Sequence, residues 1–199
     1  MGYSGSLTRE QFMFQEMRIV ARLVRDGLEE AEIKDRIVGE NLFQYPTERE
    51  IGSKCRACLK RIKCISDMPA ISEALAEGSL GEARQAALIA MMCQNQLVAQ
   101  FMICLIGEKY RMLDMTITRK DMNLFFQNLA ERDDTVAGWT ENTISKIKTV
   151  LRNCLSEADY ISDSKSEILL PVMIPEAFVE DLKHAGHREY LPAFNILDE

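Results

Sequence analysis

The residues best suited to metal or redox chemistry are two cysteines that stand three positions apart, Cys55 and Cys58. A Cys-x-x-Cys pair can supply half of a zinc site or the redox pair of an oxidoreductase. The chain has no second such pair and no histidine nearby, and no strand is expected before Cys55. We therefore expect buried core thiols at most of the six cysteines, which are Cys55, Cys58, Cys64, Cys93, Cys104 and Cys154.

The chain has only two histidines, His184 and His187, and Gly186 interrupts a helix that would let them share a metal ion. It also has no glycine-rich phosphate loop, no Gly-x-Ser-x-Gly elbow and no His-Glu-x-x-His helix. Carboxylates are plentiful, but they coincide with helix caps and solvated faces. We expect a protein that is not an enzyme and that uses no cofactor and no metal.

A basic stretch from Thr47 to Ile65 is the strongest functional signal. It has two glutamates against six cations, which are Arg49, Lys54, Arg56, Lys60, Arg61 and Lys63. Apolar residues recur there at steps of three and four, the spacing of one buried face of an α-helix. Pro46 and a capping box of Thr47 with Glu50 set its start. The pattern predicts a helix with a buried stripe and a basic back.

The basic back of this helix has two interpretations. A charged helix face is usually a solvated surface. However, six cations against two anions give this stretch an excess of positive charge that is unusual in an acidic protein. Arg49, Arg56, Lys60 and Lys63 fall within a narrow arc, as phosphate contacts would. Lys54 and Arg61 flank that arc and are included among the candidate DNA-binding residues.

A second helix with a polar back is expected from Thr140 to about Glu157, with Ile144, Ile147 and Val150 among its apolar residues. Its polar side carries residue types that contact phosphates and base edges. Those proposed to bind DNA are Asn142, Ser145, Lys146, Lys148, Thr149 and Arg152.

The net charge of −7 does not exclude a DNA-binding surface, because the acidic surplus is unevenly placed. Residues 157–199 alone carry 10 acidic and 3 basic side chains. No signal peptide is visible. The uncharged segment from Gln85 to Gly107 approaches the length of a membrane span, but amides at positions 94–96 and at Gln100 would be costly in hydrocarbon. We expect two buried helices joined or kinked at 94–96, no membrane span, and a cytoplasmic protein.

The patterns predict an all-α, compact multi-helix globule with two helix-turn-helix-like units. A first helix is expected from a cap at Ser6 or Thr8 to about Asp26, and caps at Ser79 and Thr118 are expected to start two later helices. Two apolar runs around a polar tip suggest a small β-hairpin wing near 160–173. The expected segments are an N-terminal helix-turn-helix-like unit (1–66), central buried helices (67–113), a second unit (114–174), and a C-terminal helix and tail (175–199).

Four segments, spread over nearly the whole chain, resemble the BrxA family of the bacteriophage-exclusion (BREX) defence systems of bacteria. They are Tyr3-Ser-Gly-Ser-Leu-Thr-Arg-Glu10, Glu40-Asn-Leu-Phe-Gln-Tyr-Pro-Thr-Glu48, Ile106-Gly-Glu-Lys-Tyr-Arg111 and Leu191-Pro-Ala-Phe-Asn195. The resemblance implies an all-helical protein with helix-turn-helix motifs that binds double-stranded DNA. The setting it implies is a system that methylates host DNA and blocks phage replication.

The family has also been labelled a putative inner-membrane protein, which the amides at 94–96 argue against. The resemblance brings no catalytic motif. We therefore expect a non-catalytic, double-stranded DNA-binding accessory protein with other BREX proteins as partners. The alternative is a protein–protein adaptor that uses the basic helix to dock an acidic partner in the defence complex.

Overall fold

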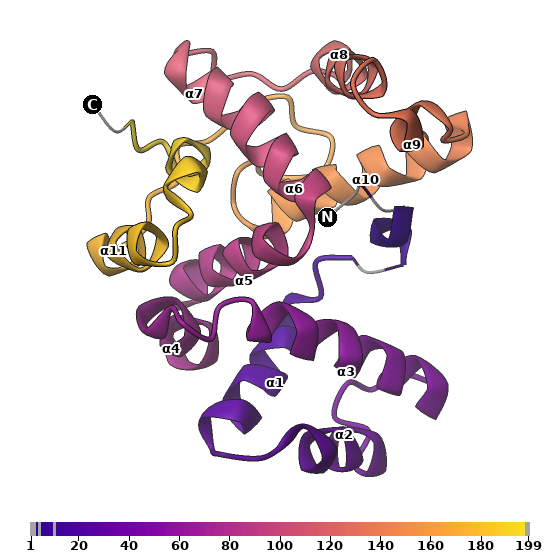
Figure 1. The fold of residues 1–199 in the computed structure, drawn as a ribbon, viewed down its shortest axis with the longest axis vertical. Helices are drawn as coiled ribbons and strands as arrows, with labels where there is room; N and C mark the ends of the chain where they lie inside the picture. Colours follow the sequence, from indigo (N-terminus) through magenta and orange to yellow (C-terminus); the bar gives the residue numbers. More distant parts are fainter. Residues whose placement is uncertain (1–2, 4, 10, 198–199) are drawn as a thin grey trace.

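The computed structural model describes residues 3, 5–9 and 11–197, and these residues form helices and connecting loops with no strand or sheet (Figure 1). The expected all-α fold is confirmed. The α-helices are α1 (Phe14–Arg25), α2 (Glu30–Gly39), α3 (Glu48–Lys63), α4 (Pro69–Glu77), α5 (Leu80–Gln94), α6 (Gln96–Phe101), α7 (Glu108–Arg111), α8 (Arg119–Ala130), α9 (Asp134–Ala137), α10 (Glu141–Glu157) and α11 (Glu176–His184). Three further helical segments are η1 (Gly5–Thr8) and η3 (Arg188–Phe194), both 3-10 helices, and η2 (Met102–Gly107), a π-helix.

Hydroxyl caps set the starts of four helices where the sequence predicts them. Thr47, Ser79, Thr118 and Thr140 each accept a hydrogen bond from the backbone N–H three residues later, at α3, α5, α8 and α10. Each cap satisfies an N–H that has no partner inside the helix. The two candidate DNA-binding helices, α3 and α10, therefore begin at the expected residues.

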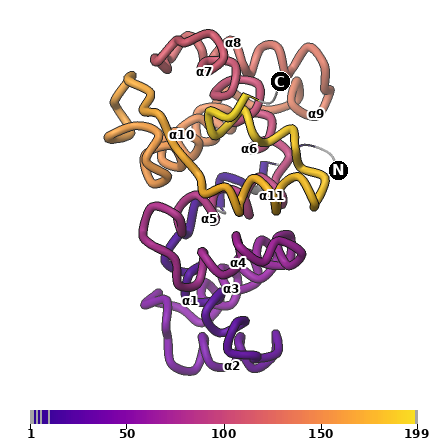
Figure 2. Tube along the Cα trace, turned by 90° about the vertical axis from the view of Figure 1, so that its left-hand side faces the viewer, coloured from indigo at the N-terminus to yellow at the C-terminus, as the bar shows by residue number. Residues whose placement is uncertain are grey.

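The first half of the chain packs α1 against α3 and α4, and α2 against α3. In Figure 2, α1 to α4 lie at one end of the molecule, α5 lies in the middle, and α6 to α10 form the other end. Gly27, with φ of 84°, lies just past the end of α1, where the left-handed region favours glycine.

The expected start of the first helix is wrong. Residues 5–8 form the separate η1, and α1 begins only after Met13, whose φ of 54° is left-handed. The Thr8 hydroxyl donates to the Gly5 carbonyl (3.0 Å) and so does not cap α1. The side chain of Ser6, the other expected cap, lies outside the described residues. Residues 9 and 11–13, between η1 and α1, are thus not helical, and Phe12 and Met13 among them are buried.

The apolar segment breaks at Asn95, as the amides predict. Its side-chain Oδ1 accepts from the N–H groups of Leu97 (3.0 Å) and Val98 (3.4 Å) and thereby caps α6. The helices on either side, Leu80–Gln94 and Gln96–Arg111, are bent by 114°. Within the described residues, no single helix is both long enough and apolar enough to cross a membrane.

Two of the segments that resemble the BrxA family meet at Gly107. A Cβ built there would lie 2.9 Å from the Cβ of Pro192 in η3, so only glycine permits this approach of η2 and η3. The η3 segment is closed by Asn195, which has a left-handed φ of 59°. This contact fixes the C-terminal segment against the middle of the chain.

The expected β-hairpin near 160–173 does not form. Leu170 N–H donates to the Tyr160 carbonyl (2.8 Å), but the partner of the 167–169 segment is residues 115–117. Ile117 N–H donates to Glu167 O (2.8 Å) and Leu169 N–H to Met115 O (3.0 Å), around an isolated antiparallel bridge of Thr116 with Ile168. The polar run 162–167 is therefore a loop beside α10, anchored to the segment that precedes α8.

Candidate nucleic-acid interface

The outer face of α3 carries the expected arc of cations. Arg49, Arg56, Lys60 and Lys63 are exposed, whereas Cys55 and Cys58 on the inner face are fully buried. None of these four cations forms an ion pair within the part of the chain that the structure describes. Lys60 and Lys63 also lie in the last turn, where cations offset the negative end of the helix dipole. The face can therefore attract an external anion without breaking an internal ion pair.

The two flanking cations of α3 point elsewhere. Arg61 is only 1% exposed, and its guanidinium donates to the carbonyls of Phe12 (2.7 Å) and Gln11 (2.9 Å). The prediction that Arg61 contacts DNA is wrong, because its guanidinium is buried and donates hydrogen bonds to backbone carbonyls inside the protein. Lys54 is half-buried. Its Nζ donates to the Arg9 carbonyl (3.2 Å) and lies 5.8 Å from the centre of the Tyr45 ring.

The outer face of α10 presents four of its six candidate residues to solvent, which are Asn142, Ser145, Lys146 and Thr149. Lys148 is half-buried, and its Nζ donates to Asn123 Oδ1 of α8 (2.7 Å) and lies 5.3 Å from the centre of the Phe126 ring. Burial lowers the pKa of Lys148. Lys148 thus joins α10 to α8 and remains at the edge of the polar face.

A hollow of about 710 Å³ lies between α8 and α10. Two residues that the sequence patterns did not single out contribute to it: Arg119, in the first turn of α8, and Asn123. The hollow combines three cations with amide and hydroxyl groups and a single carboxylate. Its lining is Arg119, Met122, Asn123, Glu141, Ile144, Ser145, Lys148, Thr149 and Arg152. The cap signal at Thr118 located the start of α8, but only the tertiary structure shows that this helix faces α10.

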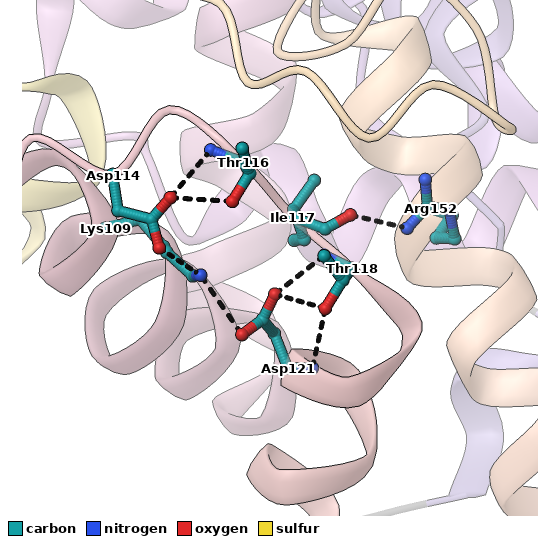
Figure 3. A network of polar contacts seen from close by, with 7 residues as sticks. All are labelled: Lys109, Asp114, Thr116, Ile117, Thr118, Asp121 and Arg152. Carbon is teal, nitrogen blue, oxygen red and sulfur yellow. Dashed lines mark hydrogen bonds and ion pairs between the residues drawn. The ribbon is translucent and has the colours of Figure 1, made fainter.

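Arg152 of α10 also forms hydrogen bonds that stabilise two neighbouring segments. Its guanidinium donates to the Ile117 carbonyl (3.3 Å; Figure 3) and so ties the 115–117 segment to α10. It also donates to the carbonyls of Ser164 (2.8 Å) and Ser166 and so holds the 162–167 loop beside α10. Arg152 thus has a structural role, while its contact with a phosphate stays a prediction. It lines the hollow, and its guanidinium makes three hydrogen bonds to carbonyls.

Lys109 ties α7 to the start of α8 (Figure 3). Its Nζ lies 2.6 Å from Asp114 and 3.0 Å from Asp121, and the same Asp121 carboxylate accepts from the N–H and hydroxyl of Thr118 (2.7 Å each). Burial acts to raise the pKa of Asp121, but the Thr118 hydrogen bonds and Lys109 outweigh it, so that the pKa is lowered. The network fixes the direction in which α8 leaves the 114–118 segment.

Replacing Asp121 by asparagine is expected to destabilise the fold by about 1 kcal/mol at pH 7, which is roughly 2–4 °C in melting temperature. Because the folded-state pKa of Asp121 is below its ordinary value of 3.8, its contribution is fully present above that pH and is lost as the pH falls through the folded-state pKa. Thermal unfolding of native and variant chains should therefore differ at pH 7 and converge near pH 2. Asp134→Asn, at an exposed position in α9, is the control and should change little. A pH-independent difference would contradict this account.

Among the described residues, no group of three or more His, Cys, Asp or Glu side chains is placed to hold a metal ion. His184 is exposed, and the ring of His187 stacks on Tyr190 at 4.7 Å. Cys58 and Cys154 are buried, and burial raises the pKa of each thiol to about 12. The expectation of core thiols is confirmed for Cys55, Cys58 and Cys154, whereas Cys104 is exposed.

Comparison with known proteins identifies the family. The family model described as BrxA matches residues 1–186. The chain belongs to the BrxA family. The family resemblance of the four sequence segments is thereby confirmed, and this BrxA-family chain is related to proteins of BREX phage-defence systems.

Two curated relatives of this BrxA-family chain, each named "BREX protein BrxA", match over most of their length. The protein from Bacillus cereus is 28% identical over 95% of this chain and 94% of its own. The protein from Paramagnetospirillum magneticum is 26% identical over 86% of this chain and 85% of its own. Neither name is that of an enzyme.

A solved structure shares the fold. The crystal structure of an uncharacterized protein from Magnetospirillum magneticum superposes with a TM-score of 0.80 at 22% identity, covering 96% of this chain and 97% of that chain. At this identity the likeness concerns the fold alone. The arrangement of helices described above is therefore one that an experimentally determined protein also adopts.

Proposed function

We propose that this BrxA-family protein is a non-catalytic, double-stranded DNA-binding accessory protein of a BREX system, and that it acts in the cytoplasm with other BREX proteins. In this proposal, residues 1–66 and 114–174 are two helix-turn-helix-like units, with α3 and α10 as their DNA-facing helices. The intervening helices (67–113) and the C-terminal helix and tail (175–199) support them.

The observation that carries the proposal is the outer face of α3. It exposes Arg49, Arg56, Lys60 and Lys63 in a chain of net charge −7, and none of the four forms an ion pair within the described residues. Four unpaired cations along one helix can each neutralise a phosphate and release its counterion. Contacts of this kind bind duplexes of many sequences with similar affinity.

The α10 face supports the proposal in a different way. Lys146 and Arg119 can contact phosphates, while Asn142, Ser145 and Thr149 present amide and hydroxyl groups of the kind that read base edges. The 162–167 loop lies beside this face because Arg152 holds it there. A modest preference for particular DNA sequences is therefore expected to come from α10.

A salt titration tests the proposal. Binding of the full chain to a fluorescent duplex of about 20 base pairs should weaken as salt rises, with a slope of log affinity against log salt of about −4 to −5, one contact contributing about −0.9. Unrelated duplex sequences should give affinities within roughly tenfold of each other, because phosphate contacts carry little sequence information. Absence of binding at about 0.05 M salt would overturn the proposal.

The competing hypothesis is an adaptor that docks the same basic helix on an acidic partner protein, and it predicts salt sensitivity too. A pull-down of the tagged protein from cells separates the two. Nuclease treatment of the lysate should release BREX proteins that are held through DNA, whereas an adaptor would keep its partner.

A further inference from the structure

The N-terminal strap, which we define as described residues 5–9 and 11–13, runs between the two candidate DNA-binding helices (Figure 1). One end forms η1, which packs against α10, and the other end leads into α1 beside α3. Neither α3 nor α10 is among the closely packed neighbours of the other, so the strap is a direct connection between them.

The strap is fastened to α3 by two cations, the half-buried Lys54 and the buried Arg61. Lys54 Nζ donates to the Arg9 carbonyl (3.2 Å), and the buried Arg61 guanidinium donates to the carbonyls of Gln11 (2.9 Å) and Phe12 (2.7 Å). Lys54 and Arg61 are seven residues apart, about 10 Å along a helix. The strap therefore lies parallel to α3 over two of its turns.

The other end of the strap packs on α10 through η1, and within η1 the side chain of Leu7 is only 1% exposed. Gly5 also lies here, because a Cβ at that position would be 3.9 Å from the Thr143 methyl group. The contact with η1 thus reaches Thr143, in the first turn of α10.

The C-terminal half of α10 is held by other groups. The Cys154 thiol contacts the Met91 sulfur of α5 (3.8 Å). Immediately after α10, Gln85 of α5 donates to the Ala158 carbonyl (2.7 Å), and Arg84 pairs with Asp159 (2.7 Å). These anchors lie beyond residues 142–149, where all but one of the candidate DNA-binding residues of α10 are found.

We propose that the N-terminal strap is the positioning element of the DNA-binding half of α10, with Leu7 as its key residue and Arg61 as its fastening to α3. The strap holds residues 141–149 against η1 and so fixes their place relative to α3. This inference rests on the proposed function for its consequence, because the residues that the strap positions are those proposed to contact DNA.

Hydrogen exchange of the full-length Leu7→Ala variant tests the positioning directly. Amides 145–149 of α10 are expected to exchange at least tenfold faster than in the native chain, while amides 151–157 and α3 keep their native rates. The matched control is Leu182→Ala, which truncates an equally buried leucine in α11. It should leave the ratio of exchange between the two halves of α10 unchanged. Uniform acceleration along α10, or none, would overturn the proposal.

Duplex binding provides the second readout. Leu7→Ala is expected to weaken binding by about three- to tenfold, and Leu182→Ala to leave it within twofold, at a temperature where both remain folded. If the alanine variant does not fold, the smaller truncation Leu7→Val should show both effects, faster exchange of amides 145–149 and weaker duplex binding, at smaller size. Selective exchange in α10 without loss of binding would refute the link to DNA.

The two proposals can fail separately. If the native chain binds no duplex, the proposed function fails, whereas the exchange experiment still decides whether the strap positions α10. If the duplex binds and Leu7→Ala affects neither exchange nor affinity, only the strap proposal fails.

Discussion

Reversing the charge of three α3 residues, in the variant Arg56→Glu with Lys60→Glu and Lys63→Glu, is expected to weaken duplex binding by more than about 100-fold at 0.1 M salt. Each lost phosphate contact is worth about 1 kcal/mol at the surface, and each new carboxylate repels the backbone. The salt slope should become shallower by about 2 to 3 units. Fluorescence anisotropy at four or five salt concentrations measures both quantities.

The α3 experiment has a control of equal charge. Reversal of Arg111, Lys183 and Arg188, on α7, α11 and η3, changes the net charge by the same amount away from both proposed DNA-facing helices. This variant should lose only the small, non-specific part of the affinity that follows net charge. Equal losses in the two variants, with native unfolding transitions, would mean that α3 is not the binding surface.

Replacing Arg61 by alanine is expected to have the largest effect on stability, about 3 kcal/mol, which is roughly 6–12 °C in melting temperature. The substitution removes the donors of the Gln11 and Phe12 carbonyls and leaves a cavity in a fully buried site. Thermal or urea unfolding followed by circular dichroism measures the change.

Arg56→Ala is the matched control, because Arg56 lies on the same helix with its side chain in solvent. It should shift stability by less than about 0.5 kcal/mol while weakening duplex binding. If Arg56 were needed for stability and Arg61 were not, the assignment would be contradicted. In that assignment Arg56 belongs to the exposed, DNA-facing side of α3, and Arg61 to its buried contact with the strap.

Helix positions were predictable because they depend on local patterns. The caps at Thr47, Ser79, Thr118 and Thr140 and the break at Asn95 each follow from residues within four positions of the feature. The exposed arc of α3 was predictable for the same reason, since the period of the helix decides which side chains share a face.

The errors concern residues whose partners are far away in the sequence. Arg61 was assigned to the outer surface because its charge suggests solvent, but its acceptors lie 49 and 50 residues earlier. The expected hairpin paired 168–172 with its sequence neighbours, whereas the bridge joins Ile168 to Thr116. In both cases the partner is distant in the sequence, so no pattern within a short window of the sequence predicts the contact.

The sequence patterns did not predict the N-terminal strap, because a left-handed backbone conformation separates it from α1. The apolar spacing from Phe12 onwards continues through the turn, so that one helix from residue 6 or 8 to Asp26 fits the pattern. The left-handed conformation of Met13 interrupts that helix, and a methionine gives no signal of it, as a glycine would.

The packing of η1 on α10 also sets an order of events during synthesis. Leu7 lies in η1 and is made 150 residues before Glu157, the last residue of the helix on which η1 packs. At translation rates of about 5–20 residues per second, roughly 8 to 30 seconds separate the two. The helices α1 to α5 can pack in this interval, whereas η1 can pack on α10 only after that helix emerges. The η1 segment is therefore one of the last of the described helical segments that can complete its packing.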